Sequence, residues 1–80
     1  MTDREIVELV KGALSKARPD LSGQFESVGI DTRFENIKMD SIDTLQMITF
    51  LEDRLGVVFQ EEELSKIETV KDLAGLINGR

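Results

Sequence analysis

Four residue types are missing from this 80-residue sequence: cysteine, histidine, tryptophan and tyrosine. Without cysteine the chain has no disulfide framework and no thiolate nucleophile of its own. Without histidine it has no imidazole base, no Ser-His-Asp triad and no histidine-ligated metal site. Because phenylalanine is the only aromatic type, with four copies, platforms for stacking nucleic-acid bases are poorly supplied. These absences argue against triad-type hydrolysis, histidine-ligated metal sites and the stacking of nucleic-acid bases.

Long apolar runs are absent as well. No run approaches the roughly 18 residues that a membrane span requires, so we expect no stable insertion into a membrane. The first residues, MTDRE, lack the basic start, the apolar run and the small-residue cleavage site of a signal peptide. A cytoplasmic location is therefore the expectation.

Negative charge is abundant and is concentrated in one window of the chain. The net charge is −6, and the window of residues 40–63 carries a single base, Arg54, against seven acids. These acids are Asp40, Asp43, Glu52, Asp53, Glu61, Glu62 and Glu63. Such a surface repels nucleic acid and anionic lipid and attracts a partner that presents a basic patch.

Apolar periodicity predicts an all-α fold in a single domain over residues 1–80. Helices are expected over residues 3–17, 41–55 and 70–78, with a short extra helix over 61–66. Thr2 or Asp3 is expected to cap the first helix, Asp40 the second and Thr69 the last, and Gly56 ends the second helix. The sum is a small bundle of three main helices plus a short one.

A long loop follows the first helix. Residues 18–39 show no clean period, and a structureless loop of this length indicates either a functional segment or a hidden helical turn. Its apolar residues are expected to fasten it to the core. They are Leu21, Phe25, Val28, Ile30, Phe34 and Ile37.

The start of the second helix has the most informative local sequence. Asp40 can accept a hydrogen bond from a free helical amide. Asp43, three residues on, can reach back to the backbone of Asp40 as the acid of a capping box. Ser41 then occupies the first helical position, where its side chain is exposed. A phosphate attached to Ser41 would be favoured by the free amides and the positive end of the helix dipole.

A helical wheel divides the second helix into two faces. The predicted core face carries Leu45, Met47, Ile48, Leu51 and Leu55. The opposite face carries Ile42, Asp43, Gln46, Thr49, Phe50 and Asp53. Because Ile42 and Phe50 are large apolar residues among acids, they indicate a docking surface. The alternative is that the long loop folds over them.

These features together resemble the acyl carrier protein family. The chain reads Asp40-Ser41-Ile42-Asp43, then an acidic helix, then Leu55-Gly56-Val57. The family has Asp-Ser-Leu, an acidic helix and a Gly-Val or Gly-Ile step. The stretch KIETVKDL over residues 66–73 is similar to the family's entry to its last helix, so the resemblance covers nearly the whole chain.

The resemblance implies a carrier rather than a catalyst. Ser41 would be esterified by 4′-phosphopantetheine, donated from coenzyme A by a phosphopantetheinyl transferase. The prosthetic thiol would hold an acyl group as a thioester, with a role in lipid metabolism such as fatty acid biosynthesis. A monomer is expected, docking to acyl-transferring or synthase enzymes that have basic patches. The expected partner-recognition residues are Asp40, Ile42, Asp43, Gln46, Phe50 and Asp53.

Four residues depart from the family pattern. Ile42 replaces the usual Leu, Gln46 replaces an acid, Phe50 is bulkier than usual, and Arg54 adds a positive charge. These changes indicate a specialised carrier with its own partner set. In the family the core can admit an acyl chain, and here six residues could line such a space or simply form the core. They are Leu45, Ile48, Leu51, Val70, Leu73 and Ile77.

Two alternatives stay open at this point. The cargo could be a fatty acyl group, a polyketide intermediate, or an aminoacyl or peptidyl group. The chain could also be a non-carrier acidic helical interaction module, which would use the same features except Ser41. An enzyme or a calcium binder is disfavoured, because neither a catalytic acid–base pair nor the ligand spacing of a calcium loop is present.

Overall fold

A computed structural model describes residues 1–79, and it confirms the all-α fold. The main helices are α1 (Asp3–Ala17), α2 (Ser41–Leu55) and α4 (Val70–Asn78), with the predicted bounds. The short helix α3 (Glu61–Leu64) ends two residues earlier than predicted. No strand occurs within residues 1–79, where an isolated antiparallel bridge joins Arg33 to Thr69.

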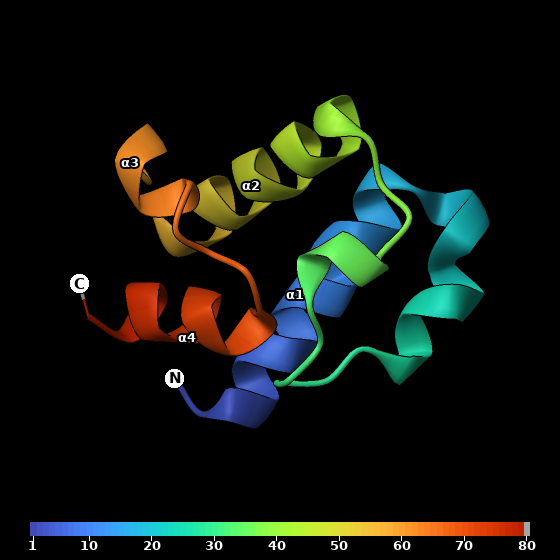
Figure 1. Cartoon of the computed structure of the whole chain (residues 1–80), viewed down its shortest axis with the longest axis horizontal. Helices are drawn as coiled ribbons and strands as arrows, with labels where there is room; N and C mark the ends of the chain where they lie inside the picture. Colours follow the sequence, from blue (N-terminus) through green and yellow to red (C-terminus); the bar gives the residue numbers. More distant parts are fainter. Residues whose placement is uncertain (80) are drawn as a thin grey trace.

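The long loop contains helical turns. Two 3₁₀ segments, η1 (Pro19–Ser27) and η2 (Phe34–Asn36), interrupt residues 18–39, so the hidden-turn interpretation is confirmed. Phe25 and Val28 are buried in the core, and the other predicted anchors are partly buried against it. The segment lies against the bundle instead of projecting from it (Figure 1).

The helix bounds follow from local capping chemistry. The Thr2 hydroxyl accepts from the Glu5 amide at 3.2 Å, and the Glu5 carboxylate accepts from the Thr2 amide at 2.8 Å. Thr69 forms the equivalent box at the start of α4. At the other end of α2, Gly56 has φ 67°, a left-handed conformation that glycine adopts without steric cost.

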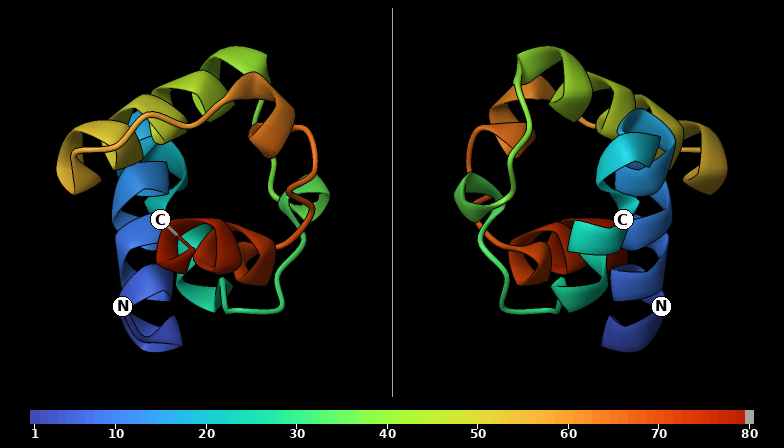
Figure 2. Two further views of the ribbon diagram at one scale, coloured as in Figure 1. Left: turned by 90° about the vertical axis from the view of Figure 1, so that its left-hand side faces the viewer. Right: turned by 90° about the vertical axis from the view of Figure 1, so that its right-hand side faces the viewer.

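The elements surround a common interior. The side views in Figure 2 place α1 on one side, α2 across the top, α4 below, and α3 with η2 on the far side. α1 packs against α2, η1 and α4. The largest side chains with relative exposure below 2% come from α1, α2 and α4: Ile6, Val10, Leu14, Leu51, Val70 and Leu73.

The η2 segment is fastened to the start of α4 through its backbone. The Phe34 amide donates to the Glu68 carbonyl at 2.9 Å, and the Val70 amide donates to the Thr32 carbonyl at 3.0 Å. The Lys71 amide donates to the Ile30 carbonyl at 2.8 Å. Because these bonds hold the first residue of η2 and the residues just before it, they fix where the Phe34 side chain enters the interior.

Candidate functional site

Ser41 opens α2, as predicted. The Asp40 carboxylate accepts from the Asp43 amide at 2.8 Å, and the Asp43 carboxylate accepts from the Asp40 amide at 3.4 Å, which completes the predicted capping box. Ser41 follows the cap directly and is exposed. The serine is therefore presented by a well-defined helix start rather than by a mobile loop.

The Ser41 hydroxyl has no partner among the residues that the structure describes. It makes no hydrogen bond to any residue of the described chain 1–79, and neither do the backbone amides of Ser41 and Ile42. Thr44, one turn on, differs because its hydroxyl donates to the Asp40 carbonyl at 3.0 Å. Ser41 thus places a free hydroxyl beside free amides at the positive end of a 15-residue helix.

Asp43 is buried, so its predicted place on the solvent face is wrong. It is 8% exposed, and its Oδ2 accepts from Arg18 Nη1 at 2.9 Å. Arg18 also donates to both carboxylate oxygens of Asp20, at 3.0 and 2.8 Å. This ion pair lowers the pKa of Asp20 and raises that of Arg18. Asp43 therefore joins the start of α2 to the end of α1.

Alanine at position 43 should destabilise the protein. Asp43→Ala removes one of the two carboxylates that bind Arg18, together with the second half of the capping box, and hydrogen bonds to charged groups each contribute about 1.5–3 kcal/mol. We expect the free energy of unfolding in urea to fall by about 2 kcal/mol. Asp53→Ala, the same change at an exposed site of α2, should stay within about 0.5 kcal/mol. Equal losses in the two variants would contradict the structural role of Asp43.

The buried face of α2 is also turned relative to the prediction. Leu45, expected in the core, is 66% exposed, whereas Phe50, expected outside, is half-buried beside Leu9 of α1. At about 100° per residue, these differences and the burial of Asp43 mean that the observed buried face is rotated by about 60° about the axis of α2 from the predicted one. Phe50 packs against the core and lines a surface groove together with residues of α1, and no residue of the long loop lines that groove.

The other predicted recognition residues lie on the surface. Ile42 is 66% exposed, and Asp40, Gln46 and Asp53 are also exposed. Ile42 and Leu45 are one turn apart, so the structure pairs two exposed apolar side chains next to Ser41. Leu45 is a surface residue that the wheel missed, because a wheel does not show which neighbours cover a helix.

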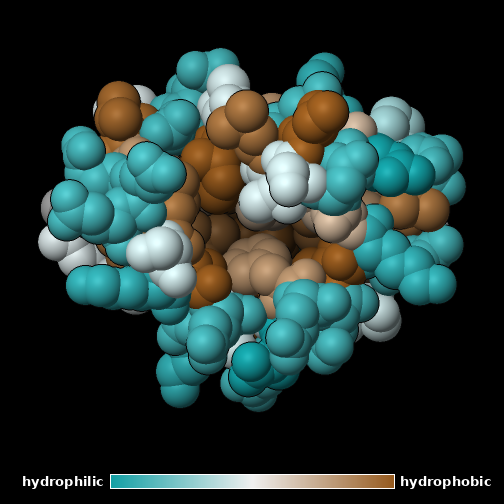
Figure 3. Space-filling model, turned by 45° about the horizontal axis from the view of Figure 1, so that its top comes forward, coloured by the Kyte–Doolittle hydropathy of each residue, from teal (hydrophilic) through white to brown (hydrophobic). Residues whose placement is uncertain are grey.

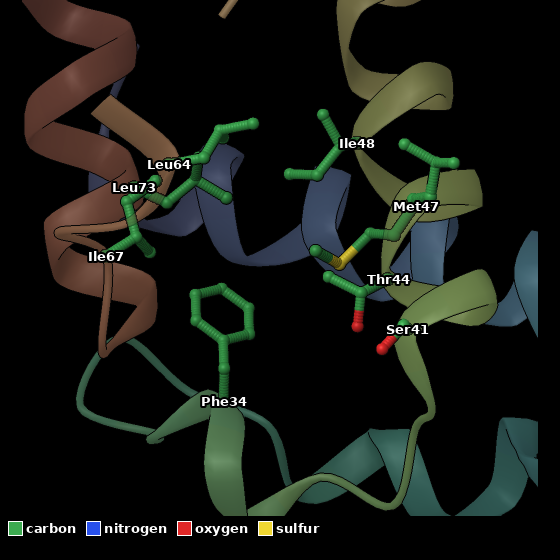
Figure 4. Close-up of a pocket in the computed structure, with 9 residues that line it drawn as sticks. Phe34, Ser41, Thr44, Met47, Ile48, Leu64, Ile67 and Leu73 are labelled. Atoms are coloured by element: carbon green, nitrogen blue, oxygen red, sulfur yellow. The ribbon is translucent and has the colours of Figure 1, made fainter. Parts of the chain in front are cut away.

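An apolar cavity opens beside Ser41. It has a volume of about 260 Å³ and is bounded by α2, α3, α4, η2 and the link after α3. The lining residues are Phe34, Ser41, Thr44, Leu45, Met47, Ile48, Leu64, Ile67 and Leu73. Figure 4 shows these side chains facing one another across the space. Apolar side chains also surround a hollow on the face of the molecule shown in Figure 3.

The cavity uses only part of the predicted lining set. Leu45, Ile48 and Leu73 line it, whereas Leu51 and Val70 are fully buried elsewhere in the core. Ile77 is not among the lining residues. The structure adds Met47 from α2 and three side chains from the far wall: Phe34, Leu64 and Ile67.

Other kinds of site find no support in the described residues. Within residues 1–79 no group of acidic side chains is arranged to hold a metal ion. None of the helices there has the length and apolar character to cross a membrane. The exposed hydroxyl of Ser41, next to the cavity, is the feature that can carry chemistry.

The comparisons with known proteins agree with this site. The family described as "Phosphopantetheine attachment site" matches residues 4–77. The chain is 35% identical to an acyl carrier protein of Thermosynechococcus vestitus, covering 100% of this chain and 96% of that protein. It is 38% identical to the actinorhodin polyketide synthase acyl carrier protein of Streptomyces coelicolor, over 75% of this chain and 65% of the relative. The chain therefore belongs to the acyl carrier protein family, whose prosthetic group is phosphopantetheine.

Proposed function

We propose that Ser41 carries the 4′-phosphopantetheine group and that the protein presents an acyl group, held as a thioester, to partner enzymes. The observation that carries this proposal is the exposed, unbonded Ser41 hydroxyl at the start of α2. When bound, the prosthetic group supplies the thiol that a chain without cysteine lacks.

The residues around Ser41 suit a phosphodiester anion. The free amides of Ser41 and Ile42 and the dipole of α2 favour negative charge at this point. Asp40 keeps the helix start in place by bonding the Asp43 amide, so the acid nearest to the serine is occupied with capping. Arg18 compensates the charge of Asp43. The protein has no catalytic role of its own in this proposal.

The cavity favours an acyl cargo over an aminoacyl or peptidyl one. Its walls are apolar apart from the hydroxyls of Ser41 and Thr44. An amino group inside it would exchange water for at most these two hydroxyl oxygens, and leaving a neutral polar group without its hydrogen bonds costs about 1–3 kcal/mol, more for a charged one. A hydrocarbon tail would gain free energy from the same transfer.

Partner enzymes are proposed to dock beside Ser41. The proposed surface contains the exposed residues Asp40, Ile42, Gln46 and Asp53, with Phe50 at its edge. Asp43 is left out because Arg18 covers it. A phosphopantetheinyl transferase and acyl-transferring enzymes with basic patches, acting in the cytoplasm on a monomeric carrier, are the partners of this proposal. The departures at Gln46 and Phe50 favour a specialised partner set.

Intact mass spectrometry tests the proposed function. The full chain is incubated with coenzyme A and a broad-specificity phosphopantetheinyl transferase. The expected result is a mass gain of a single phosphopantetheine group, which peptide mapping places on Ser41. A chain that stays unmodified while a known carrier in the same tube is modified would contradict the proposal, and so would modification at another residue.

A further inference from the structure

The cavity beside Ser41 has one wall of buried core residues and, opposite it, an outer wall of half-buried residues. Met47 and Ile48 of α2 and Leu73 of α4 are buried and belong to the core. Across from them stand Phe34 and Ile67, which are half-buried and come from η2 and the link after α3. The size of the space therefore depends on the side chains of this outer wall.

Phe34 has the bulkiest side chain of the outer wall. Figure 4 shows its ring pointing from η2 into the space between Ile67 and Leu73 on one side and Met47 and Thr44 on the other. The backbone cannot easily withdraw the ring, because the Phe34 amide is bonded to the Glu68 carbonyl at 2.9 Å. The Val70 amide, bonded to the Thr32 carbonyl at 3.0 Å, completes the bridge between Arg33 and Thr69 and so holds the residues just before Phe34.

The volume of the cavity limits what can enter it. A cavity of about 150 Å³ holds the six carbons of benzene. At the same packing, about 260 Å³ holds about ten carbons. The polar content is low, since the Thr44 hydroxyl is already bonded to the Asp40 carbonyl and no buried side-chain polar atom of residues 1–79 lacks a partner. Once Ser41 is esterified, a carbonyl in the chain would find no free hydroxyl donor there, and an amine would find only hydroxyl oxygens as acceptors.

We propose that Phe34 is a specificity-determining residue that sets the upper length of the cargo, a saturated acyl chain of up to about ten carbons. This inference rests on the proposed function, because the cavity is filled by the group that the Ser41 arm carries. Chains with oxo groups, longer chains and aminoacyl groups are held outside the protein.

Thermal unfolding of a loaded series tests the length limit. The wild type is loaded by the transferase with saturated acyl groups of even length from 2 to 16 carbons, and each product is verified by intact mass. The melting temperature is expected to rise by a few degrees with each added pair of methylenes up to about ten carbons. It should then stop rising. A 3-oxo acyl group of eight carbons should stabilise less than octanoyl.

Removal of the Phe34 ring should raise the length of the acyl chain that the cavity can hold. In Phe34→Ala the melting temperature is expected to keep rising beyond ten carbons. Phe34→Leu is a milder change that keeps the fold if the alanine variant is too unstable. It should move the chain length at which the rise stops by a smaller amount. Ile37→Ala, in the same segment but outside the cavity lining, should lower every melting temperature and leave the break point unchanged. A length-independent melting temperature, or the same break point in all variants, would overturn the proposal.

A second measurement is independent of the prosthetic group. Free 1-octanol is titrated into the unmodified wild type and Phe34→Ala, and methyl NMR signals of Ile48 and Leu73 are followed. Saturable shifts at these methyls are expected in the wild type, and their absence would overturn the cavity as the chain site. Absence of any mass gain with coenzyme A would instead overturn the proposed function, so the two failures are distinguishable.

Discussion

Ser41→Ala is expected to lose all modification by the transferase and to keep its stability. The Ser41 hydroxyl makes no hydrogen bond within the described chain, and the cap of α2 is supplied by Asp40. The free energy of unfolding should therefore change by no more than about 0.5 kcal/mol, as for other exposed sites. Intact mass after incubation with coenzyme A and the transferase gives the first result, and urea unfolding gives the second.

Two other serines serve as matched controls for this variant. Ser22 is exposed on η1, and Ser65, exposed after α3, donates its hydroxyl to the Glu62 carbonyl at 2.8 Å. Ser22→Ala and Ser65→Ala should be modified as fast as the wild type. A mass gain on Ser41→Ala would refute the assignment of the hydroxyl. Undiminished binding of a partner enzyme by Ser41→Ala, together with a wild type that is never modified, would favour a plain interaction module.

The helix bounds were predictable because local chemistry determines them. Thr2, Asp40 and Thr69 each cap a helix through a box that closes within three residues, so neighbouring positions in the sequence contain the whole interaction. The same holds for Gly56, whose left-handed backbone ends α2. Ser41 could be identified for this reason, since its environment is mostly its own helix start.

Asp43 shows the limit of such local patterns. Its partner Arg18 is 25 residues away, and nothing in the sequence around either residue indicates that they meet. A capping acid is usually exposed, and a helical wheel puts Asp43 on the face opposite to the apolar residues, so both patterns predict an exposed side chain. The burial arises only because the end of α1 arrives beside the start of α2, which depends on the path of residues 18–39.

The lining of the cavity could be predicted only in part, for a related reason. A wheel identifies apolar residues but does not distinguish a side chain packed against others, such as Val70, from one that borders a space, such as Ile48. Phe34 was expected only to fasten the loop to the core. Its role in the cavity wall depends on backbone bonds from η2 to the start of α4, which join parts of the chain that have no common pattern.

The leucines of α2 give the largest expected difference in stability between two identical substitutions. Leu51 is fully buried, and Leu51→Ala should cost about 2–5 kcal/mol because it removes packed methyl groups and leaves a cavity. Leu45, predicted for the same face, is 66% exposed, so Leu45→Ala should cost no more than about 0.5 kcal/mol.

Thermal unfolding of the two unmodified variants separates these values. A loss of 2 kcal/mol or more in so small a protein lowers Tm by at least about 8 °C, so Leu51→Ala should melt far below Leu45→Ala, which should stay near the wild type. Since both changes remove the same atoms from the same helix, helix propensity cancels in the comparison. The difference then measures burial alone, and equal melting temperatures would mean that α2 presents to the core the face that the sequence pattern predicted.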